Sequence, residues 1–159
     1  MKNLRTSVLC VCVTLYSLCS AAQANNHPVP INEPNYNKPK LFQGQPDNIP
    51  VNLDNLNSLF GKQVGLSVSV NLAETSTFQF DGQVISTVSK YDNTIQSVVL
   101  RCSNFNGAQL TISKVIDENG ATVYRGRIIS MQHGDLYELQ QNNGKYALVK
   151  RNFYDLVNE

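Results

Sequence analysis

Three cations of the chain have a spacing that suits an anion site. Lys114, Arg125 and Arg127 lie on what the sequence predicts to be the two arms of a β-hairpin turning at Asn119-Gly120. In the register of a two-residue turn the three side chains share one face, where they are expected to hold a carboxylate or phosphate. The alternative is a solvated face whose long side chains cover apolar surface.

His133 and Asp135 form a second candidate site in the turn that follows this hairpin. The two side chains offer a metal ion only two ligands, and His27 is the only other histidine of the chain, so no metal site is expected. Together with Ser130 they contain the residue types of a Ser-His-Asp triad. Residues so close on one turn do not give the triad its usual geometry, and the motif G-x-S-x-G is absent.

Cys102 is the remaining candidate nucleophile. It shares a predicted strand face with Val98 and Leu100, which favours a buried and inert thiol. The chain has no phosphate loop and no dinucleotide fingerprint, so no cofactor is expected and an enzyme is the less favoured class.

The first 24 residues have the pattern of a secretory signal peptide. Lys2 and Arg5 precede a short apolar run, 8–18, and Ala22-Gln23-Ala24 matches a cleavage site. The run is too short for a membrane span, so the pattern predicts an exported protein, periplasmic or secreted. Lipoprotein anchoring through Cys19 is the alternative, but the residues before it, 16–18, fit that processing signal poorly.

Cleavage after Ala24 leaves 135 residues with Cys102 as the only cysteine, so no intramolecular disulfide can form. It also leaves 11 basic and 12 acidic side chains, a net charge of −1. The chain has no run of basic residues, so neither nucleic acid nor an anionic membrane surface is expected as a partner.

The prolines divide the mature chain into two parts. All six prolines fall within residues 25–51, a segment otherwise rich in Asn, Gln and Lys, and this composition predicts a disordered leader. Residues 52–159 contain no proline and are expected to form a single β-domain. It would begin with a short helix, capped by Asn52, that runs from Leu53 to Phe60 and packs on the sheet.

Alternating apolar and polar residues predict about six or seven antiparallel strands in this domain. A long strand is expected across Gly82, which would mark a β-bulge, and a closing hairpin is expected around Asn143-Gly144 with Leu139 opposite Leu148. The predicted fold is all-β: a meander that closes into a barrel or a strongly curved sheet, with one short N-terminal helix. A two-sheet β-sandwich is the alternative.

The register of the hairpin around Asn119-Gly120 stays open. A two-residue turn sets Ile116 opposite Val123 but also places Lys114 opposite Arg125, which are like charges. The sequence therefore indicates either a bulge near Gly126 or a longer loop.

These observations predict an exported, non-catalytic β-domain that binds a protein or a component of the cell envelope. A small-molecule-binding barrel is the second hypothesis, and it requires an internal cavity. A hydrolase with a site near His133 is the third. The oligomeric state is left open by the sequence.

Overall fold

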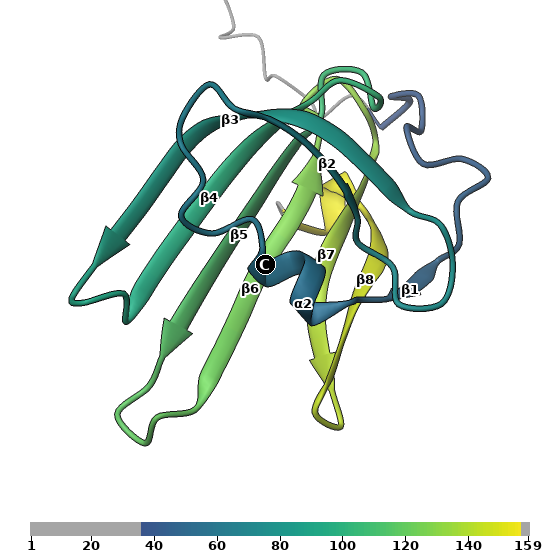
Figure 1. The fold of residues 1–159 in the computed structure, drawn as a ribbon. Helices are drawn as coiled ribbons and strands as arrows, with labels where there is room; N and C mark the ends of the chain where they lie inside the picture. Colours follow the sequence, from purple (N-terminus) through teal and green to yellow (C-terminus); the bar gives the residue numbers. More distant parts are fainter. Residues whose placement is uncertain (1–35, 157–159) are drawn as a thin grey trace, which may run out of the picture. The chain divides into compact units, whose positions relative to one another are not determined.

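Eight antiparallel strands form one curled sheet, a half-barrel, in the computed structural model of the chain, which describes residues 36–156 (Figure 1). The order across the sheet is β1-β8-β7-β6-β5-β4-β3-β2, so every strand from β2 onward pairs with its neighbour in sequence. The all-β, strongly curved architecture is as predicted, but the strand count exceeds the predicted six or seven, and the single sheet replaces the alternative sandwich. The strands are β1 (Asn48–Pro50), β2 (Ser67–Asn71), β3 (Gln79–Lys90), β4 (Ile95–Cys102), β5 (Gln109–Ile116), β6 (Thr122–Ile129), β7 (Asp135–Asn142) and β8 (Lys145–Asn152).

The curl brings the two outermost strands together at one point only. Val51, just after β1, forms an isolated antiparallel bridge with Ala73, just after β2. Two backbone hydrogen bonds flank this bridge, from Asn52 N to Leu72 O at 2.9 Å and from Glu74 N to Pro50 O at 2.8 Å. The rest of β2 has no neighbouring strand on its outer side.

The concave side of the sheet holds the hydrophobic core. Because side chains alternate along a strand, every second residue of β3 to β8 points inward, and most of these are buried among aliphatic and aromatic neighbours. The largest fully buried side chains are Tyr137, Phe42, Phe80, Ile49, Leu56, Leu59, Leu72, Leu100, Leu110, Ile112, Ile128 and Leu136.

A short helix, α2 (Leu53–Asn57), lies against this concave side. The side chain of Asn52 caps it by accepting a hydrogen bond from Asn55 N at 3.0 Å. The helix contacts β2 and β6: Asn55 Nδ2 donates to Asn71 O of β2, and the hydroxyl of Tyr124 of β6 donates to Asn57 Oδ1. It has five residues and so ends well before Phe60. A 3-10 turn, η1 (Phe153–Leu156), follows β8.

The predicted register is correct for one of two hairpins and wrong for the other. The closing hairpin β7–β8 turns at Asn143-Gly144, both with positive φ, and pairs Leu139 with Leu148 as predicted. The β5–β6 hairpin pairs Val115, not Ile116, with Val123, so the simple two-residue register is wrong and the longer loop is correct. The carboxylate of Asp117 explains the difference, because its Oδ1 accepts hydrogen bonds from two amides within the loop.

The long strand β3 is continuous, as predicted, but its irregularity is at Ile85 and not at Gly82. Gly82 pairs regularly with Val68 on one side and Cys102 on the other. A Cβ at this position would lie 2.5 Å from Arg101 O, so the glycine permits a close approach of β3 and β4.

The largest correction concerns the predicted disordered leader. Residues 36–47, which we call the N-terminal strap, pack against the sheet, and β1 follows directly. Phe42 is completely buried between the rings of Phe105 and Tyr137, and Ile49 is part of the core. The ordered domain therefore begins well before residue 52, while the predicted signal peptide and residues 25–35 lie outside the described residues.

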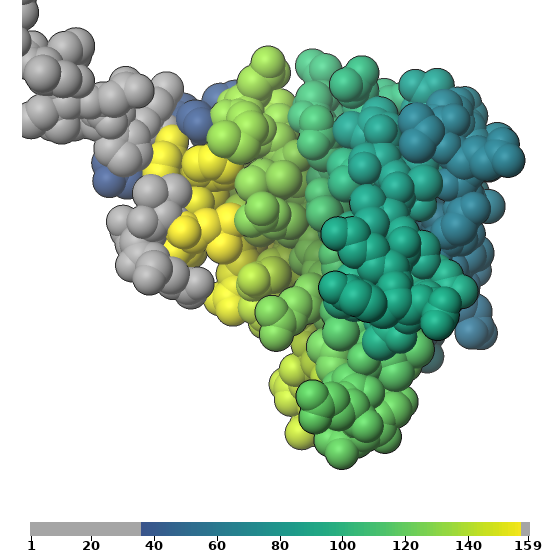
Figure 2. Space-filling model, turned by 90° about the vertical axis from the view of Figure 1, so that its left-hand side faces the viewer, coloured from purple at the N-terminus to yellow at the C-terminus, as the bar shows by residue number. Residues whose placement is uncertain are grey.

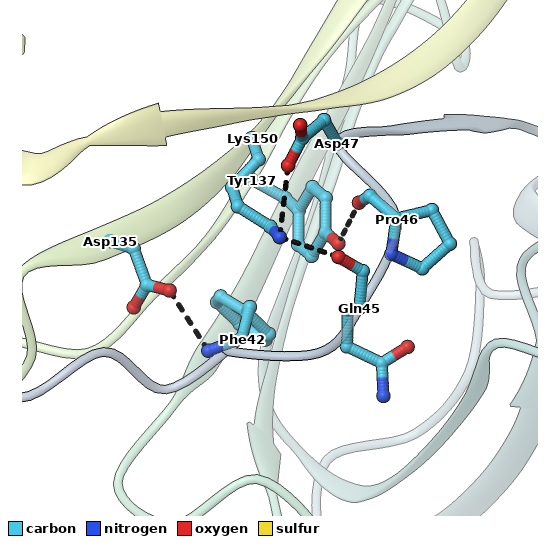
Figure 3. A network of polar contacts seen from close by, with 7 residues as sticks. All are labelled: Phe42, Gln45, Pro46, Asp47, Asp135, Tyr137 and Lys150. Carbon is cyan, nitrogen blue, oxygen red and sulfur yellow. Dashed lines mark hydrogen bonds and ion pairs between the residues drawn. The ribbon is translucent and has the colours of Figure 1, made fainter.

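Polar side chains of β7 and β8 fasten the strap (Figure 3). The buried carboxylate of Asp135 accepts hydrogen bonds from the strap amides of Leu41 at 2.6 Å and Phe42 at 2.9 Å. The hydroxyl of Tyr137 donates to Pro46 O, and Lys150 Nζ donates to Gln45 O. An irregular segment can stay packed here because side chains satisfy its backbone groups.

Candidate functional site

A polar groove of about 570 Å³ lies on the outer side of the sheet where β2, β3 and β4 run together. Its walls carry side chains that form cross-strand pairs, with Ser67 opposite Gln83, Ser69 opposite Asp81 and Gln83 opposite Arg101. The groove therefore combines hydroxyls, an amide, a carboxylate and a guanidinium. The complete lining is Ser67, Val68, Ser69, Asp81, Gly82, Gln83, Arg101, Cys102 and Ser103.

Hydrogen bonds between neighbouring strands hold the acidic side of this groove in place. Ser69 Oγ donates to Asp81 Oδ1 at 2.6 Å, and Gln79 Nε2 donates to Ser69 Oγ at 2.6 Å. Asn104 reaches across from the β4–β5 turn, accepting from Asp81 N and donating to Gln79 O. These contacts fix the hydroxyl and carboxylate before any ligand arrives.

The basic side of the groove is different, because the guanidinium of Arg101 has no ion pair among the described residues. Arg101 is exposed at the end of β4, where it stands next to Gln83 across the strand pair. A planar guanidinium with free donors is suited to binding a carboxylate in a two-point contact.

Beside this groove, β2 presents a free backbone edge. Leu72 N donates to Phe78 O on the β3 side, whereas Asn71 O accepts from the side chain of α2 on the opposite side. Along an antiparallel strand, the N–H and C=O groups of successive residues point alternately to the two sides. Ser67 and Ser69 are four and two residues before Asn71, so their N–H and C=O groups point to the free edge, as those of Asn71 do.

This edge lacks the features with which proteins usually protect exposed strands. Residues 63–73 contain no charged side chain and no proline, and β2 is regular along its five residues. At the other end of the sheet, β1 is only three residues long and ends in Pro50. Just before β2, Val64 and Leu66 expose 61% and 47% of their surfaces, respectively.

The three cations singled out in the sequence do not lie on one face. With the observed register, Lys114 pairs with Tyr124 and points to the concave side, while Arg125 pairs with Ser113 and Arg127 pairs with Thr111 on the outer side. The expected shared face was wrong because it followed from the two-residue turn. Arg125 and Arg127 remain exposed on β6, away from the groove.

His133 and Asp135 lie at the β6–β7 turn, where Asp135 holds the strap and His133 contacts Ser130. The carboxylate of Asp135 is occupied by the amides of Leu41 and Phe42. His133 Nδ1 lies 2.8 Å from Ser130 Oγ, a contact whose donor depends on the imidazole tautomer. The structure thus brings Ser130 and His133 together while the carboxylate of Asp135 binds elsewhere.

Cys102 is buried, as predicted, and its surroundings oppose ionisation. Burial raises the pKa of the Cys102 thiol, and this effect exceeds the opposing influence of nearby backbone amides. The thiol donates to Asn104 Oδ1 at 2.9 Å and accepts from Phe105 N at 3.2 Å. These contacts give it a structural role in the β4–β5 turn.

The interior of the half-barrel offers little room for a ligand. The cavity among Leu56, Leu110, Ile112, Leu139 and their neighbours measures about 10 Å³, about the space of one water-sized probe. Pockets for small molecules are typically about 300 Å³ or larger. Within residues 36–156, no three potential metal ligands cluster, and no helix is long and apolar enough to cross a membrane.

The sequence does not reveal the groove, because most of its side chains are ordinary outward-facing residues of alternating strands. The alternation of Ser67 and Ser69 with valines marked them as solvent-facing. Their proximity to Asp81 and Arg101 follows only from the pairing register of β2, β3 and β4. The absence of charges and prolines from residues 63–73 was the one available signal of an unprotected edge.

No protein-family model, no curated protein and no solved structure matches the chain.

Proposed function

We propose that the chain is an exported, non-catalytic binding domain that receives an extended segment of a partner protein along the free edge of β2. The observation that carries this proposal is an unprotected strand edge beside a preorganised polar groove. An added strand gains main-chain hydrogen bonds from the edge, and side-chain pockets beside the edge select its sequence.

The groove predicts the chemistry of the partner segment. Successive side chains of an added strand point to opposite faces, so every second one would lie on the outer side, near the groove. The free guanidinium of Arg101 favours a carboxylate there, and the hydroxyls of Ser67 and Ser103 favour polar neighbours. On the opposite face, exposed Leu66 and half-buried Val68 favour apolar partner side chains.

Export belongs to the same proposal and rests on the N-terminal signal pattern of residues 1–24. A partner would then be another exported protein or a protein component of the cell envelope. A strand-addition site is also compatible with an oxidising compartment, since the only cysteine that remains after cleavage is buried.

Site-specific photocrosslinking in the native host tests this function. A photoreactive amino acid replaces Ser67 at the β2 edge in one variant and Arg127, an exposed outer-face residue of β6, in the control variant. We expect one dominant protein adduct from position 67 that is absent from position 127. The crosslinked partner peptide should be an extended segment in which acidic and apolar residues alternate.

If both positions crosslinked the same set of proteins, the contacts along the sheet would be non-specific. A lack of any protein adduct from position 67, with efficient incorporation of the photoreactive residue, would refute strand addition at this edge.

A further inference from the structure

The outer face of the sheet carries an apolar patch at the far ends of β3 to β6, remote from the groove. Ile95, Val115 and Val123 are direct neighbours in one cross-strand row, which Lys90 continues on β3. Val88 lies on the same face in the next row, opposite Ser97. We call the four apolar residues the tip patch. Val88 and Val115 expose 42% and 37% of their surfaces, respectively, and both lie next to exposed hairpin loops.

In this region, the usual distribution of polar and apolar side chains between the two faces of the sheet is reversed. The concave-side row next to the tip patch consists of Ser89, Gln96, Lys114 and Tyr124, so polar residues face inward and β-branched residues face outward. An antiparallel sheet with one buried face normally shows the opposite pattern. Burial in the domain's own core therefore does not explain the valines and the isoleucine of the tip patch.

The loop between β3 and β4 supplies a second, independent observation. Tyr91, Asp92 and Asn93 all have positive φ, although none is glycine, and Tyr91 exposes 75% of its surface. Non-glycine residues held in this backbone region are strained and concentrate at functional sites. The strain presents an aromatic side chain at the rim of the tip patch, and tyrosine is a frequent anchor of protein interfaces.

Charges around the tip patch are unpaired and of both signs. Lys90 and Arg125 flank it and Glu118 lies on the β5–β6 loop, all exposed and without an ion pair among the described residues. Figure 2 shows this side of the domain, with the β3–β4 tip in teal and the β5–β6 tip in green. Lys90 and the exposed Asp92 belong to the β3–β4 tip, and Glu118 and Arg125 belong to the β5–β6 tip, so both tips carry charges of both signs.

We infer that the tip patch is the interface of a symmetric dimer of this chain. Two such sheets can pack face to face with their strands aligned within about 30°. A two-fold axis parallel to the strands places the β3–β4 tip of one copy over the β5–β6 tip of the other. Ile95 then packs on Val115 of the second copy, and Lys90 lies near Glu118 of the second copy.

Charge complementarity is the reason for choosing a second copy as the occupant. A two-fold interface uses the same surface twice, so the charges at one end of the patch meet those at the other end. Both ends carry both signs, with Lys90 and Asp92 on one hairpin and Glu118 and Arg125 on the other, so Lys90 of one copy can meet Glu118 of the second. The inference is independent of the β2 edge, which lies on the other side of β3.

Sedimentation equilibrium of the purified mature protein over a range of concentrations tests this interface. We expect a monomer–dimer equilibrium that Val115→Glu weakens at least tenfold, whereas Gln109→Glu, on the same face of the same strand, leaves it unchanged. Tyr91→Gly should weaken the dimer as well, although glycine relieves the positive φ and should not destabilise the monomer. This variant remains informative if Val115→Glu fails to fold.

The charge pair has its own test within the same experiment. Lys90→Glu and Glu118→Lys should each weaken self-association, and an equimolar mixture of the two variants should form heterodimers more readily than either forms homodimers. A mature protein that stays monomeric at the highest attainable concentration would overturn the inference. A dimer that withstands Val115→Glu and Tyr91→Gly but is lost with Ser69→Pro would also overturn it, because that interface would be the β2 edge.

Discussion

Tyr137 is fully buried, and its hydroxyl has a defined partner because it donates a hydrogen bond to Pro46 O of the strap. Burial, together with the negative charges of Asp47 and Asp135, raises the pKa of Tyr137 to about 12. A tyrosine in the unfolded chain titrates near its ordinary value of 10. Between these two values the folded state holds one proton more than the unfolded state.

The stability contributed by Tyr137 should therefore be complete below pH 10 and be lost as the pH rises through about 12. We expect the urea midpoint of the wild type to fall more steeply between pH 9 and pH 11.5 than the midpoint of Tyr137→Phe. Phenylalanine keeps the ring but cannot ionise, and the other tyrosines titrate in both proteins. If the urea midpoints of the two proteins fell in parallel with pH, the ionisation of Tyr137 would not be coupled to folding.

At the scale of elements, the strap shows why composition alone was a poor guide. The prolines, asparagines and glutamines of residues 36–51 have the average character of a disordered leader. Nevertheless, Phe42 of the strap, Ile49 of β1 and Val51 just after β1 enter the core. Proline suits an extended strap because it brings no backbone donor that needs a partner. Asp135 and Tyr137, about 90 residues farther along the chain, supply the remaining partners, and no local pattern reveals them.

Limited proteolysis tests how the strap is held. The bond between Lys40 and Leu41 should resist trypsin in the wild type, because the Leu41 amide is bound by Asp135 although Lys40 itself is exposed. Asp135→Ala leaves two strap amides without an acceptor, at a cost of about 2–4 kcal/mol, and should make this bond cleavable. Mass spectrometry of the fragments identifies the cut.

Asp155→Ala, which removes an exposed carboxylate of η1, is the matched control and should keep the wild-type cleavage pattern. Equal cleavage after Lys40 in all three proteins would show that Asp135 does not fasten the strap.

The two Asn-Gly hairpins show what turn residues can and cannot predict. Asn143-Gly144 forms the expected two-residue turn, with positive φ at both residues and Asn142 paired with Lys145. At Asn119-Gly120 the preceding Asp117 accepts two loop amides and enlarges the turn to five residues. This shift of one residue moved Lys114 to the other face of the sheet and removed the predicted cluster of cations.

For the whole molecule, alternation and turn residues were sufficient to predict an antiparallel, strongly curved all-β domain. They were insufficient for the candidate site, because a groove between β2, β3 and β4 depends on the register that aligns Ser69, Asp81 and Arg101. The bulge at Ile85 and the bridge between Val51 and Ala73 set the curl of the sheet, and both depend on contacts between distant segments.

The domain thus presents two surfaces with different chemistry. The β2 edge offers backbone hydrogen bonds beside a polar groove, and the tip patch offers β-branched side chains flanked by complementary charges. Since the two lie on different parts of the sheet, a dimer formed through the tip patch would leave both β2 edges available. Such a dimer could bind two partner segments, which would raise its apparent affinity for a multivalent surface.

The most direct test of the account is the affinity of the crosslinked partner for Ser69→Pro compared with Ser69→Ala, measured by calorimetry. Proline removes the outward-facing amide of Ser69 and is tolerated at an edge whose N–H faces solvent, while alanine removes only the hydroxyl. We predict that Ser69→Pro binds at least tenfold more weakly than Ser69→Ala, a difference of about 1.4 kcal/mol, because both variants lack the hydroxyl that holds Asp81 and only proline also lacks the amide. Equal affinities of the two folded variants would contradict strand addition at β2.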